Sequence, residues 1–126
     1  MKSFSEIDTT VKRASKSIGF EWGIAEELGK NIRLLEMFGL AGLKNLNSYF
    51  KIYNQKQFQK ISLISKINTS SIAYCPIISG TNFLDQVINL ETMDEINFEN
   101  MAYPLLFLPF VSRSTEILGK RIFLNI

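Results

Sequence analysis

Apolar side chains recur at intervals of three and four residues through the first 53 positions of this 126-residue chain. That spacing places them on one face of a helix. Ser3 followed by Glu6 forms a capping box, in which each side chain satisfies a free backbone N–H group. The sequence therefore predicts a first helix over residues 4–18, which Gly19 ends in a left-handed conformation.

Two further helices follow from the same spacing. We expect the second to run from residue 20 or 21 to Phe38, and the third to cover residues 41–53. Helices that each carry one apolar stripe and are joined by short turns pack together. Residues 1–53 are thus expected to form a helical half.

The chain changes character after a polar junction at residues 54–57. β-Branched and partly alternating residues then predict short strands. These strands are expected over residues 60–67, 71–75, 87–90 and 95–98, the last two as a hairpin. We expect Pro76 to end the second strand and a short helix to cover residues 81–86.

Pro104 and Pro109 limit where a helix can begin in the last part of the chain. Proline fits the first turn of a helix and breaks its interior. We therefore expect Pro104 in an apolar turn and the principal helix over residues 109–118, with Gly119 as its cap. Residues 121–125 alternate as a strand would.

These elements together predict an α+β fold. A chain of this length is typical of one domain with one hydrophobic core, so we expect a single domain over residues 1–126. In it, the three-helix N-terminal half packs on a small mixed or antiparallel sheet, with one C-terminal helix in an α/β half, residues 60–126.

The residue types also limit the chemistry. The chain has no histidine, and Cys75 is its one cysteine. The usual Ser-His and Cys-His nucleophiles and structural zinc sites are therefore excluded. No glycine-rich phosphate loop is present. We expect no cofactor and no metal, and the sequence favours a protein that is not an enzyme, while a catalytic site stays open.

The sequence predicts a cytoplasmic protein without a membrane partner. Charged residues occupy the N-terminus, where a signal peptide needs an apolar run. The longest nearly apolar stretch, residues 101–111, is shorter than the roughly 20 residues that span a bilayer. One cysteine fits a reducing compartment.

Charge is segregated along the chain, although the net charge is only +2. Residues 37–84 contain no acid, and residues 67–112 contain no base. Lys51, Lys56 and Lys60 alternate with aromatic rings, a pattern that can bind single-stranded nucleic acid. Solvated lysines explain the same pattern better, because no arginine is present there to fork onto phosphates. Nucleic-acid binding is therefore the third hypothesis.

Residues 101–111 are apolar nearly all round. Such a segment is buried in its own core or against another subunit. We expect a homo-oligomer, most simply a two-fold dimer, or an accessory role beside a partner enzyme. The candidate interface residues are Tyr103, Leu105, Phe107, Leu108 and Phe110. The leading hypothesis is a non-catalytic interaction or accessory protein that self-associates.

Two stretches of the chain carry a family resemblance. The first, residues 19–43, contains a Trp-Gly-Ile-Ala-Glu-Glu segment, and the second joins residues 75–80 to residues 104–113. Together they resemble an uncharacterised bacterial family, a domain of unknown function. The resemblance implies no activity, because none is established for that family.

A fainter likeness concerns residues 20–46. They resemble the opening helices of the malate/L-lactate dehydrogenase family that lacks a Rossmann domain. The catalytic Ser-His-Gly of that family corresponds here to Asn45, Leu46 and Asn47. The likeness therefore implies a shared helical fold without the hydride chemistry.

The alternative hypothesis is a small-molecule site, binding or enzymatic, between the two halves. The resembling segments supply its candidate residues, which are Trp22, Glu26, Cys75, Ser79 and Arg113. Arg113 could clamp a carboxylate or phosphate, and Trp22 could cover an apolar portion of the ligand. Cys75 is either a buried inert thiol or one activated by a nearby cation.

Overall fold

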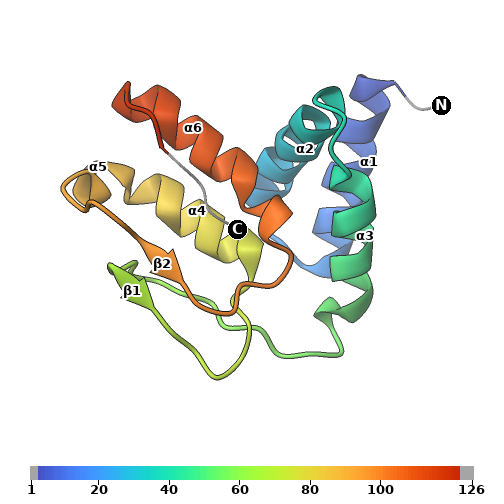
Figure 1. The fold of residues 1–126 in the computed structure, drawn as a ribbon. Helices are drawn as coiled ribbons and strands as arrows, with labels where there is room; N and C mark the ends of the chain where they lie inside the picture. The colour runs from blue at the N-terminus through green and yellow to red at the C-terminus, as the bar shows by residue number, and fades with distance from the viewer. Residues whose placement is uncertain (1–2, 123–126) are drawn as a thin grey trace. The chain divides into compact units, whose positions relative to one another are not determined.

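The computed structural model describes residues 3–122, and the chain divides into two compact units, Met1–Lys56 and Gln57–Ile126. Figure 1 shows the elements of each unit, coloured along the chain. In chain order the described elements are α1 (Phe4–Ile18), α2 (Trp22–Met37), α3 (Gly42–Tyr53), β1 (Ile67–Asn68), α4 (Pro76–Asp85), α5 (Val87–Leu90), β2 (Asn97–Phe98), a 3-10 turn η1 (Pro104–Leu106) and α6 (Leu108–Leu118).

Helix α1 begins and ends where the sequence predicts. The Ser3 Oγ accepts a hydrogen bond from the Glu6 N–H at 3.2 Å, which caps the first turn. Gly19 ends the helix with φ +116°, a conformation that residues with a side chain rarely adopt. The buried side chains of Ile7 and Val11 then face the core of the first unit.

Helix α2 packs closely against both other helices of the first unit. A Cβ added to Gly29 would lie 2.9 Å from the Asp8 carbonyl oxygen on α1, and one added to Gly42 on α3 would lie 2.9 Å from the Leu35 Cβ. The missing side chains allow this approach, which buries Leu35 and its apolar neighbours on α2. Helices α2 and α3 confirm the predicted second and third helices to within two residues at each end.

The second unit has its own core, formed by α4, α5 and α6 with the segments around them. Its buried cluster comprises Ile64, Phe83, Leu90, Phe107 and Val111. The Phe107 ring packs edge-on against Phe83 at a centroid distance of 5.4 Å and against Phe98 at 5.3 Å. Aromatic pairs prefer such edge-to-face geometry.

A two-stranded parallel sheet crosses the second unit, with Ile67 opposite Asn97 and Asn68 opposite Phe98. The buried Asn68 amide holds this short sheet together. Its Oδ1 accepts from the Ser65 N–H, and its Nδ2 donates to the carbonyl oxygens of Ser65 and Asn97, each at 2.9 Å.

The strand predictions for the second half were largely wrong. Residues 87–90 form helix α5, so the predicted hairpin does not exist, although β2 lies within the predicted strand 95–98. The sheet is parallel rather than mixed or antiparallel. Of the predicted strands 60–67 and 71–75, only Ile67 lies in a strand, and Tyr74 makes isolated bridges. A short apolar run of β-branched residues cannot be assigned to strand or helix by periodicity alone.

The helices predicted for the second half agree better with the structure than the strands do. Pro76 begins α4 as its first residue, and that helix covers most of the predicted helix 81–86. Helix α6 matches the predicted principal helix, and Gly119 caps it at φ +65°. Of the predicted strand 121–125, residues 121 and 122 are not in a strand, and the rest lies outside the described residues. The fold is thus mostly helical with a small parallel sheet.

Candidate functional site

The structure divides the predicted ligand residues between the two units. Trp22 and Glu26 lie on α2 in the first unit, where Trp22 is exposed. Cys75, Ser79 and Arg113 belong to the second unit. A common site that spans both units stays a prediction.

Cys75 and Ser79 lie one turn apart at the start of α4. The Ser79 N–H donates to the Cys75 carbonyl oxygen at 3.0 Å. Both residues are completely buried, at 0% exposure. Neither side chain offers a surface to a dissolved ligand in this structure.

Arg113 lies on α6 and is half-buried. Burial lowers the pKa of its guanidinium, while the Glu116 carboxylate, three residues further along the helix, acts in the opposite direction. Arginine remains protonated near neutrality because its ordinary pKa is far higher.

The predicted interface segment contributes to the core of its own unit. Phe107 and Phe110 are buried, while Tyr103, Leu105 and Leu108 are half-buried. Tyr103 adopts a left-handed conformation, with φ +46°, where the chain enters η1. Within one copy of the chain, the two phenylalanine rings are therefore already covered.

The aromatic rings of the lysine-rich segment pack together in the first unit. Tyr49 is buried, and the Phe20 ring lies 6.0 Å from Phe50 and 5.1 Å from Tyr53, measured between centroids. These contacts occupy ring faces on which nucleic-acid bases would otherwise stack.

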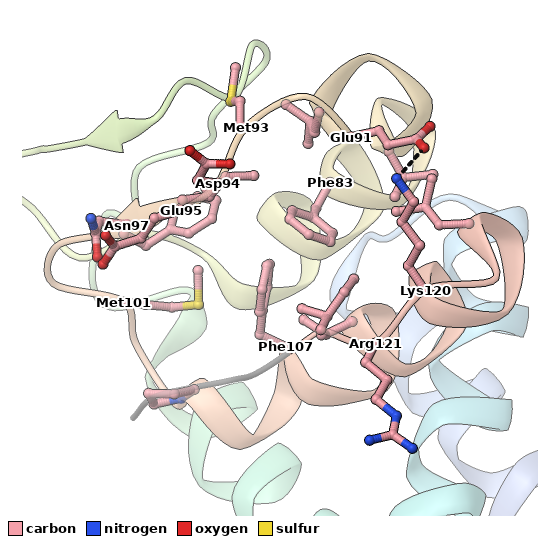
Figure 2. A pocket seen from close by; sticks show the side chains of 18 residues that line it. Phe83, Glu91, Met93, Asp94, Glu95, Asn97, Met101, Phe107, Lys120 and Arg121 are labelled. Carbon is pink, nitrogen blue, oxygen red and sulfur yellow. Dashed lines mark ion pairs between the residues drawn. The ribbon is translucent and has the colours of Figure 1, made fainter.

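The second unit contains an open pocket of about 890 Å³ over its core. It lies where the buried cluster meets partly buried side chains that only half cover it, among them Met93, Phe98 and Met101. Figure 2 shows the Met101 side chain extending toward the Phe107 ring across this space. The lining residues are Phe83, Val87, Leu90, Glu91, Met93, Asp94, Glu95, Ile96, Asn97, Phe98, Met101, Pro104, Phe107, Val111, Leu118, Lys120, Arg121 and Ile122.

Acidic side chains on the loop between α5 and β2 form one side of the pocket mouth. Glu91 pairs with Lys120 at 2.7 Å, so these two charges offset each other. Asp94 and Glu95 are exposed on the same loop. Figure 2 shows the Arg121 guanidinium pointing away from this loop. The mouth is therefore negative on its loop side.

The pocket could not be predicted from the sequence. Residues 67–112 contain no base, and Asp94 and Glu95 are part of that pattern. The available signal was an acidic turn next to the apolar residues 87–90, which the hairpin prediction assigned to a strand.

The pocket thus combines phenyl, thioether and aliphatic walls with exposed carboxylates at its mouth, an arrangement that can accept an apolar group. Such walls supply burial, and a few polar groups at the edge set orientation. In residues 3–122, no three acidic or cysteine side chains gather in a way that could hold a metal ion. No helix in that part of the chain is long and apolar enough to cross a bilayer.

The chain belongs to a family of proteins of unknown function, DUF3726, whose model matches residues 2–74. This confirms the resemblance to an uncharacterised family, and the match contains its Trp-Gly-Ile-Ala-Glu-Glu segment. The second resembling stretch and all pocket residues follow the matched segment. No curated protein matches this chain, and no solved structure matches it.

Proposed function

We propose that this is a non-catalytic binding protein whose second unit takes an apolar group attached to a positive charge. The observation that carries the proposal is the pocket itself, with phenyl and thioether walls and two exposed carboxylates, Asp94 and Glu95, at its mouth. Its volume lies in the range of ordinary small-ligand sites.

The walls supply most of the affinity. Complete burial of one phenyl-sized group is worth about 2 kcal/mol. The nearly buried rings of Phe83 and Phe107 form the floor beneath such a group, and the thioethers of the half-buried Met93 and Met101 adapt to its shape.

The carboxylates select the sign of the ligand charge. An exposed pair of opposite charges contributes roughly 0.5 kcal/mol. Asp94 and Glu95 together should therefore favour a cation over a neutral molecule of the same shape by about fivefold.

Methionine methyl groups report on the pocket directly. Met93 and Met101 line it, whereas Met37 lies in the first unit. We expect phenethylammonium to shift the ¹³C-methyl signals of Met93 and Met101 in the full chain, with weaker binding for phenethyl alcohol and the weakest for phenylacetate. Signals are assigned by replacing each methionine with leucine.

A double variant, Asp94→Asn with Glu95→Gln, serves as the matched control. It should bind phenethyl alcohol as the unaltered chain does and lose the preference for the cation. Equal binding of cation and anion by the unaltered chain, or unmoved Met93 and Met101 signals with all three compounds, would show the proposal to be wrong.

A further inference from the structure

The turn between α2 and α3 exposes an apolar cluster that nothing in its own unit covers. Phe38 is 74% exposed, Met37 is 54% exposed and Leu40 is 39% exposed. Three neighbouring apolar side chains in water form a patch of the kind that interaction sites use. We call residues 37–41 the apolar turn.

The backbone of the apolar turn is already fixed. Gly39 reverses the chain at φ +72°, and the Leu40 N–H donates to the Leu35 carbonyl oxygen at 2.9 Å. The Glu36 carboxylate accepts from the Gly42 N–H at 3.0 Å, which caps α3. A turn held in this way loses little conformational freedom when it binds, so more of its burial appears as affinity.

The apolar turn has the chemistry that the pocket selects. It presents a phenyl ring, a thioether and an isobutyl group, and the exposed bases Arg33 and Lys44 lie on the helices to either side of it. The one acid between them, Glu36, is half-buried and directs its carboxylate to the Gly42 N–H. Two exposed bases therefore outnumber this acid, and the apolar turn is flanked by net positive charge.

We infer that the pocket of one copy of this chain binds the apolar turn of a second copy. The inference rests on the proposed function, because it names the occupant of the same pocket. Charge complementarity supports it: Arg33 and Lys44 beside the turn oppose Asp94 and Glu95 at the pocket mouth. The contact joins two different surfaces, and it closes into a dimer when each copy supplies its turn to the other.

The test follows the full chain with labelled methionine methyl groups over a dilution series, together with sedimentation velocity. We expect the Met37, Met93 and Met101 signals to shift with one common midpoint as the chain associates. Phe38→Asp should raise the dissociation constant about tenfold or more, because it replaces a buried phenyl ring by a charge like that of the mouth. Leu63→Asp is the matched control, since Leu63 is also 74% exposed but does not line the pocket; it should leave association unchanged.

A mixing experiment tests the pairing itself. Phe38→Asp removes the turn and leaves the pocket intact, whereas Met93→Lys blocks the pocket mouth and leaves the turn intact. Neither variant should associate alone at the chosen concentration, and a mixture of the two should form a complex. Met93 is partly exposed, and a urea midpoint of the dilute Met93→Lys chain close to that of the unaltered chain verifies that its core is formed.

Several results would overturn the inference. One is a chain that stays monomeric throughout the dilution series, and another is association that survives Phe38→Asp. A third is a shift of the Met93 and Met101 signals when residues 123–126 are removed, without any shift when Phe38 is replaced by Asp, because the occupant of the pocket would then not be the apolar turn. If phenethylammonium still shifts Met93 and Met101 in such a case, the proposed function stands and only the occupant is wrong. If it does not, both fall.

Discussion

Gly80 on α4 lies directly beneath the Phe110 ring of α6, and Gly80→Ala tests this packing. An added Cβ would lie 2.6 Å from two carbons of that ring and closer still to Cδ2. Ordinary contacts of this kind begin at 3.4 Å. Phe110 is 1% exposed, so its ring has no solvent to move into. The substitution must therefore push α6 away from α4.

The magnitude follows from two opposing effects. Alanine is favoured over glycine inside a helix by about 1 kcal/mol. Overpacking a core costs about 1–3 kcal/mol, and the enclosed ring places this site near the upper end of that range. We therefore expect Gly80→Ala to lower the free energy of unfolding by about 2 kcal/mol. In urea this corresponds to a midpoint lower by about 1 M.

The assay is urea unfolding followed by far-UV circular dichroism. Gly23→Ala is the control, because Gly23 is also helical and an added Cβ there meets nothing within 4 Å; it should raise the free energy of unfolding by about 0.5 kcal/mol. In a Phe110→Leu background the cost of Gly80→Ala should fall by about 1 kcal/mol or more. A Gly80→Ala chain as stable as the unaltered protein would refute the packing described for α4 and α6.

Three other outcomes follow from the second unit. Asn68→Leu should lower the free energy of unfolding by about 3 kcal/mol in the same urea assay, since it leaves three backbone groups of Ser65 and Asn97 without their amide partner; no change would mean that the amide does not hold the sheet. The buried Cys75 thiol should react with a disulfide reagent about a hundredfold more slowly in the native chain than in urea, and equal rates would contradict its burial. Raising the ionic strength from about 0.05 to about 0.5 M should weaken phenethylammonium binding about twofold while leaving phenethyl alcohol unaffected, and an equal effect on both would exclude attraction by the carboxylates at the mouth.

The helices of the first unit could be predicted because each carries its own signals. Ser3 and Glu6 lie three residues apart in sequence and meet in the observed cap, and Gly19 and Gly39 adopt positive φ where the pattern breaks. These interactions are local, so the sequence displays them directly. The same holds for α6, with Pro109 in its first turn and Gly119 after its end.

The sheet could not be predicted because long-range contacts define it. Its strands are two residues long, too short to display alternation, and Ile67 pairs with Asn97 across 30 positions of sequence. The residue types of Val87 to Leu90 favour a strand, yet these residues form α5 directly after α4. Within α5, the side chains of Val87 and Leu90 are the buried ones. Tertiary burial decided between two local conformations that the residues permit equally.

The candidate site divides in the same way. Residue type indicated that the Cys75 thiol and the Arg113 guanidinium could take part in a ligand site. Whether a ligand can contact them depends on their burial, which the sequence does not show. The pocket combines residues of α4, α5, β2, η1 and α6, so no single motif contains it. The one feature of the pocket that the sequence indicated is its acidic loop, through the absence of bases from residues 67–112.

The family match ends at residue 74, inside the second unit, and this boundary makes a prediction about fragments of the chain. Residues 2–74 contain all three helices of the first unit but only part of the second. The partners of the included part lie further along: β1 pairs with β2, and the Tyr74 N–H donates to the Asn100 carbonyl oxygen at 2.9 Å. Residues 57–74 alone therefore lack the contacts that order them.

Fragments that end at residue 56 and at residue 74 should both retain α1 to α3. They should show equal helical circular dichroism per molecule and the same unfolding midpoint by fluorescence of the single tryptophan, Trp22. Amide signals of residues 57–74 in the longer fragment should lie at random-coil positions. Dispersed signals for Ile67 and Asn68 would contradict this prediction. In that case residues 57–74 would fold without the rest of the second unit. The pocket would then be added to a family segment that folds by itself, and its residues would not be needed to complete the fold of that segment.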